Sequence, residues 1–203
     1  MHKSLIVVED FYVDPQEVRQ RALSCDYPPV TGPRTFPGRN GAEPFLPPDL
    51  DRMISMLLGE KVVSCARPRS FHGSFRITLA DEESRYHVHV DPSYLCWVGV
   101  LYLNPPEQCR GGTAFDRHKE LGLDRTPPQE ALEAKGYPDL ATLLAQDGPD
   151  PDKWEHLMTL PMRFNRLILY RPWIWHSAAP GFGDSNETGR LIQIFSFESG
   201  AGG

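Results

Sequence analysis

Short strand-like segments dominate the chain from Gly73 to Phe197, and they constrain its fold more than any other feature. Each segment is bounded by Pro, Gly or Asp, and the segments do not alternate with helices as they would in a parallel α/β sheet. Eight can be counted, at 73–79, 86–91, 95–103, 112–115, 154–160, 165–170, 174–178 and 190–197. Eight short strands with long crossings favour a mainly β fold with flanking helices, namely a jelly roll or double-stranded β-helix.

Two helices are predicted ahead of this region. Asp14 has the position of an N-cap for a first helix that should run to about Ser24. Asp49 is predicted to cap a second helix over residues 50–58, where apolar residues recur at helical spacing. Residues 26–48 between the helices contain seven prolines, so an extended surface loop is expected there.

The length of 203 residues fits one domain, 1–203, with a well-buried core. We expect that core to occupy about residues 71–198, with residues 1–60 as helical support. Residues 117–153 interrupt the strand pattern with helical or irregular sequence. Because long loops on a rigid scaffold carry specificity, this segment is predicted to be a substrate lid.

The densest group of metal-ligating side chains lies in the segment 86–92, Tyr-His-Val-His-Val-Asp-Pro. Read as a strand, it places His87, His89 and Asp91 on one face. An imidazole and a carboxylate two residues apart could fill two neighbouring coordination positions. The His-x-Asp spacing favours His89 as the ligand and leaves His87 near the metal or facing substrate.

A third ligand is expected on a late strand, because two facing sheets bring early and late strands together. His176 is the strongest candidate, since it lies in the apolar sequence 173–178. Two histidines and one carboxylate leave coordination positions open, as non-haem Fe(II) enzymes require, whereas a structural zinc site is closed by four protein ligands.

Arg190 follows His176 by fourteen residues and opens the alternating apolar strand 190–197. An arginine on the inward face of such a strand needs an anionic partner, and its fork of donors matches a carboxylate. The terminal carboxylate of 2-oxoglutarate would supply that partner. Arg166 is the alternative anchor.

The order His89-x-Asp91, His176, Arg190 resembles the Fe(II)- and 2-oxoglutarate-dependent dioxygenase superfamily. The sequences 100–104 and 111–115, and 166–170 before His176, resemble its prolyl-hydroxylase-type branch. An uncharacterised bacterial family of oxygenase-like proteins is also similar and shares the N-terminal helix pair. The resemblance covers about residues 71–198. It implies Fe(II), 2-oxoglutarate and O2 as cofactors, and the hydroxylation or other oxidation of a substrate C–H bond.

Many members of that superfamily carry a tyrosine that touches 2-oxoglutarate on the third core strand. Alignment through Asn104 places Leu101 at this position and predicts that Tyr102 points the other way. This leaves Arg190 as the one predicted contact to the cosubstrate.

Two alternatives remain open at the level of sequence. One is a non-enzymatic, cupin-like module that binds a metal or a ligand, and the other is a metal enzyme of this fold that does not use 2-oxoglutarate. Arg190 favours the oxygenase, since a structural metal site has no need of a buried partner for a carboxylate. Asp116 and His118 are predicted to be loop residues near the entrance, and Asp147 a solvated acid of the lid.

The formal charge of −6 and the pI near 5.6 argue against general affinity for nucleic acid or anionic lipid, so the expected partner is a small-molecule or peptide substrate. The four cysteines form no Cys-x-x-Cys pair and are interpreted as free thiols. The first apolar run is too short for a signal peptide and no run is long enough for a membrane span, so a cytoplasmic protein is expected.

Overall fold

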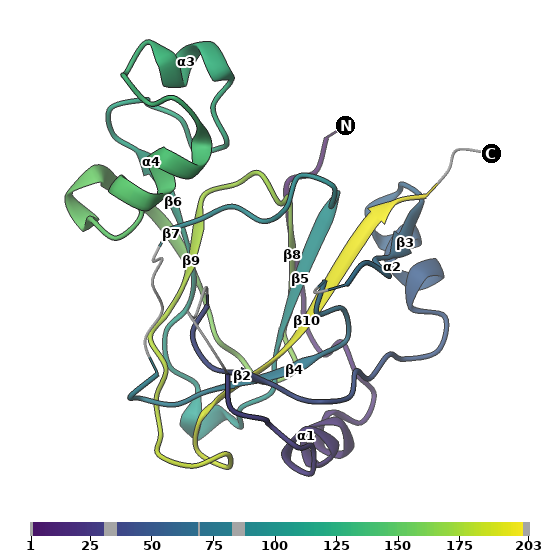
Figure 1. Cartoon of the computed structure of the whole chain (residues 1–203). Coiled ribbons are helices and arrows are strands. Elements are labelled where there is room, and N and C mark those ends of the chain that lie inside the picture. Colours follow the sequence, from purple (N-terminus) through teal and green to yellow (C-terminus); the bar gives the residue numbers. More distant parts are fainter. Residues whose placement is uncertain (1, 31–35, 69, 83–87, 201–203) are drawn as a thin grey trace.

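The computed structural model describes residues 2–30, 36–68, 70–82 and 88–200. Within these ranges the strands form two antiparallel sheets that face each other (Figure 1). The large sheet contains β1 (Leu5–Val8), β2 (Arg39–Asn40), β3 (Val62–Ser64), β4 (Phe75–Thr78), β5 (Trp97–Tyr102), β8 (Leu167–Tyr170) and β10 (Arg190–Ser199). The small sheet contains β6 (Gly112–His118), β7 (Trp154–Pro161) and β9 (His176–Ala178). The order is β1-β8-β5-β10-β4-β2 in the large sheet, with β3 also paired to β10, and β7-β6-β9 in the small one.

The chain crosses repeatedly between the two sheets, which is the path of a jelly roll. After β4 in the large sheet, His89 bridges to His176 in the small sheet, and the chain then returns to the large sheet with β5. It continues through β6 and β7 in the small sheet, β8 in the large, β9 in the small and β10 in the large. The predicted fold is therefore confirmed. Of the predicted strand 86–91, the described part forms an isolated bridge at His89 instead of a continuous strand.

The two N-terminal helices are α1 (Pro15–Leu23) and α2 (Leu50–Leu58), close to their predicted bounds. Asp14 caps α1 by accepting a hydrogen bond of 3.0 Å from the main-chain N–H of Glu17. The predicted cap of α2 is wrong. Asp49 has a left-handed φ of 57° and makes no capping hydrogen bond, and its carboxylate lies 3.4 Å from Arg52 instead.

Three apolar layers hold the described part of the structure together. The outer face of the large sheet packs against α1 and α2 through residues such as Ala22, Ile54, Leu101 and Phe195. Residues such as Tyr102, Phe115, Ile168, Tyr170 and Ile192 fill the space between the sheets. Each large side chain fully buried in this way contributes roughly 1.5–3 kcal/mol of hydrophobic stabilisation.

The third layer joins the small sheet to the segment 117–153, which contains α3 (Gln129–Glu133), α4 (Leu140–Asp147) and the 3-10 helix η2 (Pro151–Lys153). Its buried residues are Val88, Leu132, Tyr137, Leu143, Trp154 and Trp175. Figure 1 shows α3 and α4 grouped beside one end of β6 and β7. No helix of the described residues is both long and apolar enough to span a membrane.

Candidate functional site

The structure brings His89, Asp91 and His176 together on the inner side of the small sheet. One ligand atom from each residue lies within 4.8 Å of the other two. Nε2 of His176 lies 3.2 Å from Oδ2 of Asp91, and the imidazole rings of His89 and His176 are 4.3 Å apart. Two ligands at right angles, each about 2.1 Å from a metal ion, would lie about 3 Å apart, so this spacing fits a metal centre.

The tautomer of His176 is also suited to binding a metal. Its Nδ1 lies 2.9 Å from the carbonyl oxygen of Ile174, which can only accept, so Nδ1 carries a proton and donates it. In the neutral ring the lone pair is then on Nε2, the nitrogen that faces Asp91. A second hydrogen bond that orients the ring in this way is typical of histidine ligands.

The charges of the cluster favour its ionised form. Burial alone would raise the pKa of Asp91, but His176, His89 and Arg76 outweigh it, and the pKa lies below its ordinary value. Burial alone would lower the pKa of His176, but Asp91 outweighs it, and the pKa lies above its ordinary value. A metal ion at this cluster would compete with a proton for Nε2 of His176.

Arg190, the first residue of β10, lies between the sheets and is only 2% exposed. Its Nε has no hydrogen-bond partner among the described residues, and burial lowers its pKa. Thr78, opposite Arg190 in the register of β4 and β10, is 1% exposed, and its hydroxyl also lacks a partner in the described chain. Two buried donors without acceptors fit a small anion that would accept from both.

The predicted direction of Tyr102 is wrong. Tyr102 lies between the sheets, its ring centroid is 5.9 Å from Cζ of Arg190, and its hydroxyl lies 2.7 Å from that of Thr113. Leu101 instead packs in the outer layer under the N-terminal helices. Successive residues of a strand face opposite sides, so a one-residue error in alignment exchanges the two faces.

Arg76 on β4 is a second arginine at the site, and sequence reasoning missed it. It lies two residues before Thr78 on the same strand, so the two side chains share a face. Phe75 and Ile77, which alternate with them, are fully buried in the outer layer. That alternation was the available signal, since it is the pattern that drew attention to Arg190.

Two further residues were candidates from sequence, Arg166 as an anchor for the cosubstrate and His87 as a residue near the metal. Arg166, the alternative anchor, donates to Glu9 through Nε at 2.9 Å and Nη2 at 2.6 Å, so its charge already has a partner. His87 lies outside the described residues.

Asp116 and His118 are not loop residues, because both lie in β6 and are buried. Oδ1 of Asp116 lies 3.2 Å from Nδ1 of His156 on the neighbouring strand. Asp147 is buried as well, with its Oδ2 2.8 Å from Nε2 of His118, and it accepts a 2.6 Å hydrogen bond from the hydroxyl of Tyr137. The contact of Asp147 with His118 of β6 fastens the 117–153 segment to the small sheet.

A cavity of about 440 Å³ adjoins the cluster. It is lined by Val90, Asp91, Pro92, Ser93, Leu95, Thr126, Leu140, Pro172 and Trp173. Thr126 and Leu140 belong to the 117–153 segment, so that segment borders a space that reaches Asp91.

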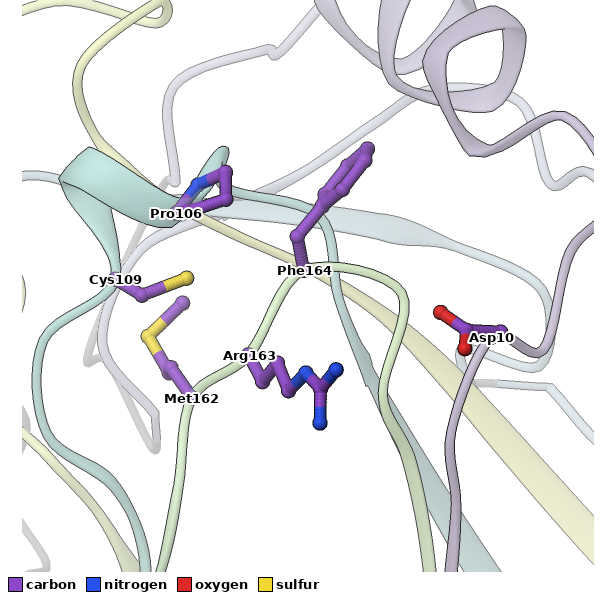
Figure 2. Close-up of a pocket in the computed structure, with 6 residues that line it drawn as sticks. All are labelled: Asp10, Pro106, Cys109, Met162, Arg163 and Phe164. Atoms are coloured by element: carbon purple, nitrogen blue, oxygen red, sulfur yellow. The ribbon is translucent and has the colours of Figure 1, made fainter.

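A second cavity, of about 340 Å³, contains none of the site residues. Figure 2 shows its lining by Asp10, Pro106, Cys109, Met162, Arg163 and Phe164. Pro106 belongs to the 3-10 helix η1 (Pro106–Gln108), and Met162, Arg163 and Phe164 form the turn between β7 and β8.

Fold and site together define a class, namely jelly rolls that gather two histidines and a carboxylate on their small sheet. Residues 1–195 match the model of a family described as a family of unknown function, DUF6445, and the chain belongs to that family. The sequence matched none of the curated proteins with which it was compared.

Several solved structures are similar to the chain at low sequence identity. HygX from Streptomyces hygroscopicus with iron bound is 13% identical, with 98% of this chain and 83% of that chain covered and a TM-score of 0.48. HygX with nickel and 2-oxoglutarate bound is 14% identical at the same coverage and TM-score. EctD from S. alaskensis with 2-oxoglutarate and 5-hydroxyectoine is 16% identical, with 97% and 72% covered and a TM-score of 0.48.

Proposed function

We propose that the protein is an Fe(II)- and 2-oxoglutarate-dependent dioxygenase that oxidises a C–H bond of a small-molecule or peptide substrate. The observation that carries the proposal is the pairing of two features in one interior. A cluster of two histidines and one carboxylate lies there together with Arg190, a buried cation that has no acidic partner among the described residues. A metal-binding module without a cosubstrate would explain the cluster but not the buried arginine.

His89, Asp91 and His176 would hold the metal. Three protein ligands leave open positions on an ion that prefers six, which suits a site that must also bind a cosubstrate and O2. When bound, Fe(II) and 2-oxoglutarate supply the oxidising chemistry, in which the oxo acid is decarboxylated to succinate as O2 is reduced. The protein residues bind and orient these groups.

Arg190 and Thr78 would receive the distal carboxylate of 2-oxoglutarate. Both are buried and oppose each other across β4 and β10, so a carboxylate could accept from the guanidinium and the hydroxyl together. Tyr102 forms one wall of the same space, with its hydroxyl held by Thr113.

The packing around the ligands is suited to excluding water. The ring of His176 packs against Tyr170 at 4.6 Å, and Tyr170 packs against Phe115 at 5.6 Å. Apolar walls protect a reactive oxidant from solvent, which is a requirement of this chemistry. The segment 117–153 borders the cavity beside Asp91 and would act as the substrate lid.

The sequences 100–104 and 166–170 are similar to motifs of the prolyl-hydroxylase-type branch, which supports placing the protein near that branch. The absence of basic runs in a chain of net charge −6 supports a substrate other than nucleic acid. A cytoplasmic location is part of the same proposal.

The proposal is tested by adding Fe(II) and then 2-oxoglutarate to the protein under anaerobic conditions. Chelation of Fe(II) by the oxo acid should produce a weak visible charge-transfer band that saturates with 2-oxoglutarate. Succinate, which cannot chelate through an oxo acid, is the matched control and should give no band. If Fe(II) binds and no band forms at saturating 2-oxoglutarate, the cosubstrate is wrong and a metal-binding module becomes the better description.

A further inference from the structure

The site contains one more positive charge than the proposed cosubstrate accounts for. Arg76 and Arg190 both project from neighbouring strands of the large sheet into the space between the sheets. Neither forms an ion pair with an acid in the part of the chain that the structure describes. If the distal carboxylate of 2-oxoglutarate pairs with Arg190 and its other carboxylate binds the metal, Arg76 is left without a carboxylate in direct contact, and Asp91 acts on its charge only from a distance.

The guanidinium of Arg76 is held in a fixed orientation. Its Nε donates a hydrogen bond of 2.7 Å to Oδ1 of Asn40, which pairs with Arg76 across β2 and β4. Its Cζ lies 3.8 Å from the ring centroid of Phe36 and 5.6 Å from that of Phe71, and these two rings meet edge to face at 5.2 Å. Such stacking fixes the plane of a guanidinium without using its terminal donors.

The two terminal nitrogens of Arg76 have no hydrogen bond in the described chain. They are the pair that would bind a carboxylate in bidentate fashion. Arg76 is partly exposed, which leaves it open to a ligand, whereas Arg190 is enclosed. Burial and the adjacent Arg190 lower the pKa of Arg76 to about 9, so it stays charged at neutral pH. Arg76 also helps to lower the pKa of Asp91, so its charge acts at the proposed metal ligands.

We propose that Arg76 is a specificity-determining residue that binds a carboxylate of the substrate through its terminal nitrogens. The substrate would then be an organic acid, or a peptide that presents a carboxylate. This inference rests on the proposed function, because the charge of Arg76 is in excess only when 2-oxoglutarate occupies Arg190. The contacts of Arg76 would hold the substrate carboxylate beside the metal centre. The C–H bond to be oxidised would then lie at a fixed distance from that carboxylate.

The test uses Mn(II) as a paramagnetic stand-in for Fe(II) and acetate as the probe of the anion site. The full-length protein is loaded with Mn(II), the dissociation constant of 2-oxoglutarate is measured, and the cosubstrate is then kept saturating. The longitudinal relaxation rate of the acetate methyl protons is followed as acetate is added, with Mg(II) as the diamagnetic reference. The methyl protons of acetate bound at Arg76 should relax faster in the Mn(II) protein than in the Mg(II) protein.

Arg76→Met should weaken acetate binding at least about tenfold, because a charge-assisted bidentate contact contributes more than 1.4 kcal/mol. It should leave the dissociation constant of 2-oxoglutarate within about threefold of the wild type. Arg76→Lys keeps the charge but not the fork, and it should retain part of the acetate effect. Arg39→Met, which removes a guanidinium paired with Glu82 from the adjacent position of β2, is the matched control and should retain all of it.

Three outcomes would overturn the inference. The first is no metal-dependent relaxation of acetate in the wild type, and the second is equal relaxation of acetate in the folded Arg76→Met protein. The third is that Arg76→Met weakens 2-oxoglutarate binding as strongly as loss of Arg190. The last outcome would assign Arg76 to the cosubstrate. Failure of the proposed function itself is seen earlier and separately, as failure of the wild type to bind 2-oxoglutarate before acetate is added.

Discussion

His89 and His176 exchange both of their main-chain hydrogen bonds, at 2.9 and 3.0 Å, while their imidazole rings lie 4.3 Å apart. The same pair of residues thus forms the sheet bridge and two sides of the candidate metal centre. Because the backbone bridge sets the separation of the two rings, the ligand geometry is built into the sheet. Such a site needs little rearrangement to accept an ion.

Replacing His176 with alanine should abolish tight binding of Fe(II). The variant loses a candidate ligand whose other ring nitrogen is oriented by the carbonyl of Ile174. Loss of a group that only orients a ligand lowers metal affinity by about 10–100-fold, so we expect the affinity for Fe(II) to fall by more than about 100-fold when the ligand itself is lost. Anaerobic titration with Fe(II) measures this. His156→Ala, which removes a half-exposed histidine from β7, should bind the metal as the wild type does. Equal loss in both variants would contradict the assignment.

Replacing Arg190 with methionine should weaken 2-oxoglutarate binding and spare the metal. Loss of a buried charge-assisted pair costs about 2–5 kcal/mol, which corresponds to at least about a 30-fold rise in the dissociation constant. The charge-transfer band at increasing 2-oxoglutarate gives that constant, and an Fe(II) titration checks the metal. Arg166→Met serves as control, because that arginine pairs with Glu9. An unchanged constant in Arg190→Met would move the anchor elsewhere.

Replacing Asp147 with alanine should destabilise the protein by about 3 kcal/mol, because it removes the acceptor shared by His118 and Tyr137 and leaves two buried donors without a partner. Urea unfolding followed by tryptophan fluorescence measures the change. Asp152→Ala removes an exposed acid of the same segment and should change stability by less than about 0.5 kcal/mol. A mild effect of Asp147→Ala would mean that the apolar layer alone fastens the segment 117–153.

Stability should fall as the pH drops below about 6.5, in part because of His72. Burial lowers the pKa of His72, and its Nδ1 accepts a 2.9 Å hydrogen bond from the main-chain N–H of Ser196. The unfolded chain then binds more protons between the folded pKa and about 6.5, so stability rises with pH across that window, by at most about 1.4 kcal/mol per pH unit.

The variant His72→Asn keeps an acceptor for Ser196 and removes the titration. Thermal unfolding at pH 5.5 and 7.5 should therefore show a smaller difference in Tm for the variant than for the wild type. An identical difference in both proteins would assign the pH dependence to other groups.

The grouping of His89, Asp91 and His176 could be predicted from sequence. His89 and Asp91 combine a ligand spacing with a strand pattern, and His176 lies where a facing strand must return. The direction of the side chains on the large sheet was harder to predict. Tyr102 was assigned to the wrong face, because strand parity depends on a register that only the paired partner, here Ile192, defines. Arg76 was missed, although it lies in the predicted strand 73–79, because a single arginine in a short strand looks like an ordinary exposed charge unless its alternation with Phe75 and Ile77 is considered.

The N-terminal region shows a similar limit. β2 lies within the proline-rich segment that was expected to be irregular, and it pairs with β4 over Arg39 and Asn40. A strand of two residues has no periodicity to detect, so it depends on the tertiary partner. The capping interaction expected of Asp49 failed because its backbone is left-handed and its carboxylate lies near Arg52 instead of accepting from a main-chain N–H, and the sequence carries no signal for that conformation.

β10 lies in the interior of the large sheet and pairs with β3, β4 and β5, although it follows all of them by a long stretch of chain. Closing such long loops carries an entropic cost that must be met before the native contacts form. During synthesis, β4 and β5 would lack their shared pairing partner until residues 190–199 had left the ribosome. Arg190, at the start of that strand, would thus be among the last parts of the candidate site to reach its position, so the site would be assembled only after β10 has paired with β4.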